Sequence, residues 1–128
     1  MRHHSRKLIQ LSTWVHQTRS NVLRTLLTNL VTSGHITTTP KRAKVLKAYA
    51  DHFFARLVRL HHDRPTDSTR EGIRYVKSVI WTEDAGKKVM KDIVPSYISQ
   101  QKTSGFVANY KLWFRKWDGA EQVRVTLI

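Results

Sequence analysis

The chain has 128 residues and carries 23 lysines and arginines against 9 aspartates and glutamates, so its formal net charge is +14 with histidine neutral. It contains no cysteine, which excludes disulfide bonds, thiol catalysis, thiolate zinc sites and iron–sulfur ligation. Hydrophobic residues make up 40% of the chain and no stretch approaches 18 consecutive apolar residues, so we expect one folded domain over residues 1–128 and no membrane span.

The positive charge is concentrated in the first half of the chain. Residues 1–64 carry 12 cations against Asp51 and Asp63, whereas residues 65–128 carry 11 cations against 7 anions. Cations in such excess repel one another unless a polyanion lies among them. Nucleic acid supplies dense negative charge of fixed shape. An anionic membrane surface is a less specific alternative. A start that is rich in arginine and serine and poor in acids is also typical of a mitochondrial transit peptide.

The chain begins with a basic segment. Residues 2–11 have only weak periodicity, which predicts an extended arm. Residues 8–17, which follow the first basic residues, are too polar for the apolar segment of a signal peptide. Ser12 or Thr13 is the candidate N-cap of a first helix, and Gly34 is its candidate left-handed stop. Apolar residues at three- and four-residue intervals predict the buried face of this helix: Val15, Val22, Leu23, Leu26, Leu27, Leu30 and Val31.

A short β-prone segment and a second helix follow. Residues 35–38 predict a strand, and Thr39-Pro40 predicts an N-cap and a first helical residue, because proline lacks only an N–H that is unpaired there. The second helix is expected to extend to about His61. Its apolar stripe predicts a core-facing side: Ala43, Leu46, Ala50, Phe53, Leu57 and Leu60, widened by Tyr49 and Phe54.

Two more helices are predicted after a turn at residues 63–67. Ser68 and Glu71 have the spacing of a capping box, which predicts the start of the third helix. Thr82 is the candidate N-cap of the fourth helix, which we expect Pro95 to end. The apolar residues of these helices predict their buried sides: Ile73, Val76, Ile80, Val89, Met90, Ile93 and Val94.

The period of the apolar residues changes to two near the end of the chain. Residues 106–117 and 120–128 predict two strands joined by a tight turn at Asp118-Gly119. Alternation predicts one buried sheet face: Phe106, Ala108, Tyr110, Leu112, Phe114, Val123, Val125 and Leu127. Because a lone hairpin is barely stable, we expect helices to cover it and residues 35–38 to join its edge. The predicted fold is an α+β, two-layer domain with the order helix, strand, three helices, two strands, in which a small antiparallel or mixed sheet packs on the helices.

The cations of the first half are the candidate nucleic-acid ligands. The arm is expected to become ordered on RNA, as basic segments do. Arginine can donate two parallel hydrogen bonds to a phosphate and can stack on bases, whereas lysine acts as a point charge. Thr37, Thr38 and Thr39 offer hydroxyl groups at the start of the second helix, where backbone N–H groups also point outward, so this position predicts an anion site together with simple N-capping by Thr39.

Four segments carry a more specific pattern. They are Met1-Arg2-His3-His4, the helix that contains His16 and Asn21, the run from Gly34 to Lys44, and the final strands around Arg115, Asp118 and Ala120. In this order they resemble the bacterial ribosomal protein L17 family, over nearly the whole chain. The chain departs from that family before the hairpin, where Ser104-Gly105-Phe106-Val107-Ala108 replaces a Gly-Gly-Tyr-Thr-Arg segment and lacks its basic residue.

The resemblance implies a structural, non-catalytic protein of the large ribosomal subunit. It implies packing against large-subunit rRNA near the outer rim of the polypeptide exit tunnel, beside other ribosomal proteins, in a cytoplasmic or an organellar ribosome. Charge and resemblance together give the predicted RNA-binding residues: Arg2, His3, His4, Arg6, Lys7, His16, Arg19, Arg24, His35, Thr37, Thr38, Lys41, Arg42, Lys44, Lys47, Lys102, Lys111 and Arg115.

Other functions have less support in the sequence. The seven histidines lack zinc-site spacing, and the chain has no glycine-rich phosphate loop, so we expect no metal, no cofactor, no small-molecule substrate and no enzymatic activity. The main alternative is a free-standing DNA-binding or nucleoid protein that places the helix at residues 41–47 in a groove, although a β-prone segment separates its two helices. Trp113 and Trp117 are candidates either for base stacking or for packing on a neighbouring protein.

Overall fold

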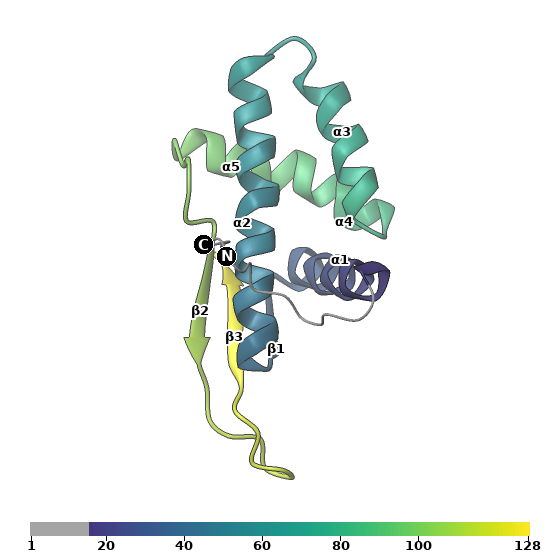
Figure 1. Ribbon diagram of the computed structural model, residues 1–128. Coiled ribbons are helices and arrows are strands. Elements are labelled where there is room, and N and C mark those ends of the chain that lie inside the picture. Colours follow the sequence, from purple (N-terminus) through teal and green to yellow (C-terminus); the bar gives the residue numbers. More distant parts are fainter. Residues whose placement is uncertain (1–15) are drawn as a thin grey trace, which may run out of the picture.

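The computed structural model describes residues 16–128 (Figure 1), so the predicted arm and the candidate N-caps Ser12 and Thr13 lie outside the described residues. The predicted α+β class and the order of the elements are confirmed. The elements are α1 (His16–Ser33), β1 (His35–Thr38), α2 (Pro40–Asp63), α3 (Ser68–Val79), α4 (Glu83–Lys88), a π-helical turn (Val89–Ile93), α5 (Val94–Ser99), β2 (Val107–Lys111) and β3 (Val123–Leu127). None of the helices in the described part is long and apolar enough to cross a bilayer.

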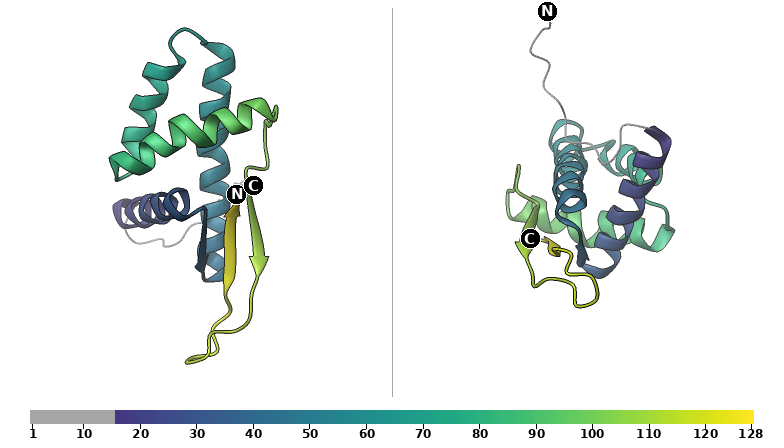
Figure 2. Two further views of the ribbon diagram at one scale, coloured as in Figure 1. Left: turned by 180° about the vertical axis from the view of Figure 1, so that it is seen from behind. Right: turned by 60° about the horizontal axis from the view of Figure 1, so that its bottom comes forward.

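The three strands form one antiparallel sheet in the order β1-β3-β2. Strand β1 pairs with β3 from His35 opposite Thr126 to Thr38 opposite Val123, so the predicted edge position of residues 35–38 is confirmed. The sheet lies beside the first half of α2, and α3 lies beside its second half (Figure 1). The rod formed by α4, the π-helical turn and α5 crosses α2 on the side that faces away from the viewer in Figure 1 and toward the viewer in the left view of Figure 2. Helix α2 therefore connects the two ends of the molecule.

The core is built around α2. The predicted apolar stripe is confirmed, because Ala43, Leu46, Ala50, Phe53 and Leu57 are buried and Leu60 is half-buried. Two further α2 residues, Val45 and Val58, are also buried. The reason is that α2 packs against α1, α3, α5 and the sheet, so its apolar surface is wider than the stripe of a helix with one covered side.

The first helix ends where the sequence predicted. Gly34 has a φ of +81°, and its N–H donates to the carbonyl of Leu30 at 2.7 Å. This left-handed residue turns the chain directly into β1, because glycine has no Cβ to oppose a positive φ. The predicted buried face of α1 is confirmed at Leu27, Leu30 and Val31.

The predicted buried face of the hairpin is wrong by one residue on its first strand. Residues directly opposite each other in an antiparallel pair share a face, and here Asn109 is opposite Val125 and Lys111 is opposite Val123. Tyr110 lies on the other face and is 57% exposed. Residues 110–114 are almost all apolar, so alternation alone does not specify which set faces the helices.

The predicted two-residue turn is also wrong. The strands end at Lys111 and Val123, and the chain reverses over residues 116–119, where the N–H of Gly119 donates to the carbonyl of Arg115 at 2.8 Å. Gly119 has a φ of +68°, but Asp118 does not have the positive φ that a tight Asp-Gly turn requires at both central residues. The hairpin is consequently longer than predicted and extends past the helices (Figure 1).

Pro95 does not end the fourth helix, contrary to the prediction. A proline inside an α-helix crowds the carbonyl four residues earlier and removes one N–H. Here the helix widens into a π-helical turn at Val89–Ile93, and Pro95 falls in the first turn of α5, which continues to Ser99. The wider turn accommodates the proline where a regular α-helical turn would not.

One predicted cap and one predicted core residue are also wrong. Asp67, not Ser68, is the N-cap of α3, and the Ser68 hydroxyl donates to the carbonyl of Pro65 at 3.1 Å. The predicted N-cap of α2 is confirmed at Thr39, although its side chain makes no cap hydrogen bond. Ile73 is 41% exposed because the groove between α3 and α4 leaves it uncovered.

Candidate nucleic-acid interface

The start of α2 and the end of β2 form a groove of about 570 Å³, here called the α2–β2 groove. Its lining residues are Pro40, Lys41, Lys44, Asn109, Lys111 and Val123. The groove is held together by Asn109, whose side-chain amide donates to the carbonyl of Ala43 at 3.2 Å and so fixes β2 to the first turn of α2.

Three predicted RNA-binding lysines meet in this groove. Lys41 and Lys44 are three residues apart and lie on one side of α2, and Lys111 is the last residue of β2. All three side chains are exposed. Within residues 16–128 no carboxylate lies within 4.0 Å of their amino groups. The groove therefore presents three positive charges that the described part of the protein does not neutralise.

The strand that leads into α2 extends the same end of the molecule. His35 and Thr37 are exposed on the edge strand β1, whereas Thr38 is half-buried. Arg42 is exposed in the first turn of α2. The backbone N–H groups of this first turn donate no hydrogen bond to the Thr39 side chain, so the positive end of the helix is available to an anion.

Two of the predicted residues bind within the protein. The Nε of Arg24 donates to the carbonyl of Val79 at 2.9 Å and joins α1 to the end of α3. Lys47 is 3.6 Å from the carboxylate of Asp51. The same carboxylate accepts hydrogen bonds from the backbone N–H groups of Phe106 and Val107, both at 3.1 Å, so it fixes the start of β2 to α2.

Two others lie away from the α2–β2 groove. Lys102 lies near the opposite end of β2 from Lys111, where its amino group donates to the carbonyl of Ile128 at 3.3 Å. Arg115 lies near the end of the hairpin, where its Nε donates to Asp118 Oδ1 at 2.9 Å. This hydrogen bond holds the pKa of the Asp118 carboxyl below its usual value.

The remaining predicted residues have no described side chain. His16 and Arg19 belong to the first turns of α1. Arg2, His3, His4, Arg6 and Lys7 lie outside the described residues. All of them stay predictions.

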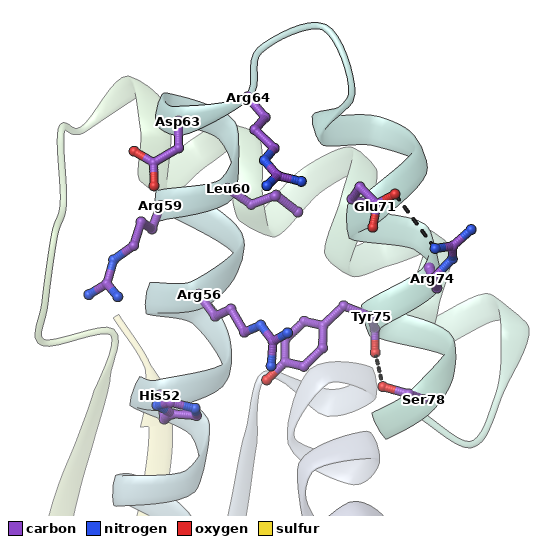
Figure 3. Close-up of a pocket in the computed structure, with 10 residues that line it drawn as sticks. All are labelled: His52, Arg56, Arg59, Leu60, Asp63, Arg64, Glu71, Arg74, Tyr75 and Ser78. Atoms are coloured by element: carbon purple, nitrogen blue, oxygen red, sulfur yellow. Dashed lines mark hydrogen bonds and ion pairs between the residues drawn. The ribbon is translucent and has the colours of Figure 1, made fainter.

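The structure adds a second basic groove that the sequence analysis missed. It lies between α2 and α3, has a volume of about 730 Å³ and is here called the α2–α3 groove (Figure 3). Its lining residues are His52, Arg56, Arg59, Leu60, Asp63, Arg64, Glu71, Arg74, Tyr75 and Ser78. The spacing of residues 52, 56, 59 and 63 places them on one side of a helix, but only the position of α3 turns this side into a groove.

The end of the hairpin is a different kind of surface. In residues 112–122, here called the hairpin tip, two cations stand against two anions, Asp118 and Glu121. Trp113, Phe114 and Trp117 in this segment are 89%, 64% and 79% exposed. The hairpin tip is thus apolar and electrically neutral, in contrast to the two grooves.

Within residues 16–128, no group of three or more histidine and carboxylate side chains is arranged so that it could hold a metal ion.

Comparison with known proteins gives consistent matches. A family model described as "Ribosomal protein L17" matches residues 22–128. The "Large ribosomal subunit protein bL17" of Moorella thermoacetica is 33% identical over 110 residues, which cover 86% of this chain and 89% of that protein. Proteins of the same name from Carboxydothermus hydrogenoformans and Clostridium tetani are 31% and 30% identical over 110 residues, which cover 86% of this chain and 89% and 88% of those proteins.

Proposed function

Because the chain belongs to the ribosomal protein L17 family, whose members are structural and non-enzymatic constituents of the large ribosomal subunit, we propose that it binds large-subunit rRNA through its basic N-terminal arm and its first two helices. Binding of this kind supports subunit assembly and translation, because cations placed on phosphates remove repulsion between RNA segments that must come together. The relatives compared above are bacterial, and the proposed particle is a bacterial-type ribosome of the cytoplasm.

The α2–β2 groove is the observation that carries this proposal. Lys41, Lys44 and Lys111 come from two elements far apart in the sequence and converge on one groove, and no carboxylate of the described residues pairs with them. A polyanion with regularly spaced charges is the ligand that such a groove fits best. Thr37 and the first turn of α2 beside it supply hydroxyl and N–H donors for phosphate and ribose oxygens.

The remaining contacts follow from the same surface. Five further residues are proposed to extend the interface around the start of α2 and along α1: His35, Thr38, Arg42, His16 and Arg19. The arm residues Arg2, His3, His4, Arg6 and Lys7 are proposed to enter the RNA next to it. Four residues are proposed to contribute less to RNA binding, because internal partners already engage their charged groups. They are Arg24, Lys47, Lys102 and Arg115.

The hairpin tip is proposed to contact a neighbouring large-subunit protein near the exit-tunnel rim. Trp113 and Trp117 are among the most exposed large apolar residues of the described part, and the segment that carries them has no net charge. Exposed tryptophans without excess cations favour a protein surface over a phosphate backbone.

The binding of the protein to its rRNA as a function of salt tests this proposal. If about 6 to 10 phosphates are neutralised, affinity falls by roughly 10³ to 10⁵ between 50 and 200 mM salt. The triple variant Lys41→Gln, Lys44→Gln, Lys111→Gln lowers the slope of this dependence by about three if each lysine contacts one phosphate. The charge-matched control is Lys87→Gln, Lys91→Gln, Lys116→Gln.

Three results would overturn the proposal. They are an affinity that salt does not change, equal slopes for the two triple variants, and a protein that sediments with DNA rather than with large subunits in a low-salt lysate. The last result would favour a free-standing DNA-binding protein.

A further inference from the structure

We propose that the exposed side of α2 is a continuous RNA-binding track, whose far end is a second phosphate site in the α2–α3 groove formed by Arg56, Arg59 and Arg64. This inference rests on the proposed rRNA binding and extends it to residues that charge and family resemblance did not single out. The track, here called the α2 track, consists of Lys41, Lys44, Ala48, His52, Arg56 and Arg59.

The spacing of the α2 track makes it continuous. Its members follow one another at intervals of three or four residues, which places them along one side of the helix. All six side chains are exposed. From Lys41 to Arg59 the helix rises about 27 Å at 1.5 Å per residue. The small side chain of Ala48 in the middle leaves room for a nucleic-acid strand to approach the helix.

The charge along the α2 track has one sign. Asp51 lies beside it, but its carboxylate is directed to the start of β2, where it accepts the N–H groups of Phe106 and Val107. Asp63 is the first carboxylate beyond Arg59 on this side of α2. A strand that leaves the α2–β2 groove therefore meets no opposing negative charge on this side of α2 before it reaches the arginines.

The arginines of the α2–α3 groove are available to a ligand. Within the described part of the chain, no carboxylate lies within 4.0 Å of the guanidinium groups of Arg56, Arg59 and Arg64. Arg74, on the opposite wall, is 3.7 Å from Glu71, which also lies 3.9 Å from Arg70. Figure 3 shows Arg56 and Arg64 between the two helices. The wall of the groove that α2 forms thus keeps a net positive charge.

One of these arginines is held in place before any ligand binds. The guanidinium carbon of Arg56 lies 4.3 Å from the centre of the Tyr75 ring, and that ring packs on Phe53 with centroids 5.3 Å apart. Stacking on the ring face leaves the N–H donors at the edge of the guanidinium free to fork onto a phosphate. Because its side chain is already ordered, Arg56 loses less conformational entropy on binding than a free lysine.

The absence of cysteine from the chain allows a direct test by directed hydroxyl-radical cleavage. An iron chelate is attached to a single cysteine introduced as Ser78→Cys, at the rim of the α2–α3 groove, or as Thr37→Cys, on β1. Each labelled full-length protein is then reconstituted into large subunits. We expect cleavage of rRNA from both positions. We expect the substitutions Arg56→Gln and Arg64→Gln to weaken the cleavage from position 78 at least severalfold while cleavage from position 37 persists.

The outcomes separate this inference from the function on which it rests. Cleavage from position 37 alone, or cleavage of a neighbouring protein instead of rRNA from position 78, overturns the second site and leaves the proposed function standing. No rRNA cleavage from either position overturns both.

A second measurement separates the loss of an RNA contact from a folding defect. The salt dependence of rRNA binding is compared between the pair Arg56→Gln, Arg64→Gln and the pair Arg70→Gln, Lys77→Gln, with circular dichroism as the check on folding. Both pairs remove two positive charges, but Arg70 and Lys77 do not line the α2–α3 groove. The groove pair lowers the salt slope by about two and the control pair leaves it nearly unchanged. Equal slopes would overturn the second site. The conservative variant Arg56→Lys, which keeps the charge, supports the site if it preserves binding.

Discussion

The guanidinium of Arg24 lies over the indole ring of Trp81, with its carbon 3.7 Å from the ring centre. Its Nε also donates to the carbonyl of Val79, so this side chain joins α1 to the segment between α3 and α4. Arg24 was predicted as an RNA ligand from charge and resemblance. The geometry gives it a structural contact as well, so its effects on stability and on RNA binding can be measured separately.

Substitution of Arg24 is expected to lower stability more than RNA binding. Arg24→Met removes a stacked cation and a charged hydrogen bond, so the free energy of unfolding falls by about 2 kcal/mol in urea denaturation. The salt slope of rRNA binding stays near that of the unsubstituted protein. If stability were unchanged and the slope fell by one, Arg24 would be an RNA contact rather than a link between helices.

The hairpin tip is expected to keep its ion pair at acidic pH. Hydrogen bonding from Arg115 lowers the pKa of Asp118, so the pair is fully formed above the ordinary carboxyl pKa and is lost only as the pH falls through the lower value in the folded protein. A carboxyl titration followed by NMR measures this. We expect Arg115→Gln to raise the pKa of Asp118 toward its ordinary value, and an unchanged titration would contradict the assignment.

The exposed tryptophans are expected to matter for the particle and not for the fold. Trp113 and Trp117 are 89% and 79% exposed, so Trp113→Ala with Trp117→Ala leaves the urea midpoint within experimental error. Binding to free rRNA stays the same, whereas retention of the protein in large subunits at high salt decreases. A loss of affinity for free rRNA would instead assign these rings to base stacking.

Much of the fold follows from local sequence features. The apolar stripe of α2, the glycine stop at Gly34 and the strand character of residues 35–38 were predicted because each depends on residues close together in the chain. The failures depend on distant contacts or on competing patterns. The face of β2 was mispredicted because residues 110–114 are almost all apolar, so alternation does not specify which set faces the helices, and the π-helical turn that admits Pro95 has no simple sequence pattern.

In the candidate interface, too, some features follow from local sequence and others depend on distant contacts. Lys41 and Lys44 were predicted from the charge of a helix start, and Lys111 was predicted from charge and resemblance, but only the folded chain brings all three into one groove. The α2–α3 groove was missed because residues 52, 56 and 59 resemble an ordinary solvated helix face until α3 lies opposite them. The internal partner of Arg24 has no local signature, because it comes from the end of α3. The pairing of Lys47 with Asp51 does have one, because the two residues are four apart in α2.

The most direct test of the account is the reactivity of lysines in intact large subunits. An amine-acylating reagent is applied to the free protein, to purified subunits and to subunits treated with ribonuclease, and each lysine is quantified by mass spectrometry. We predict that Lys41, Lys44 and Lys111 react in the free protein, are protected in the subunit and regain reactivity when the rRNA is digested. If these three lysines react equally in the free protein and in the intact subunit, the α2–β2 groove faces solvent and the proposed RNA interface is wrong.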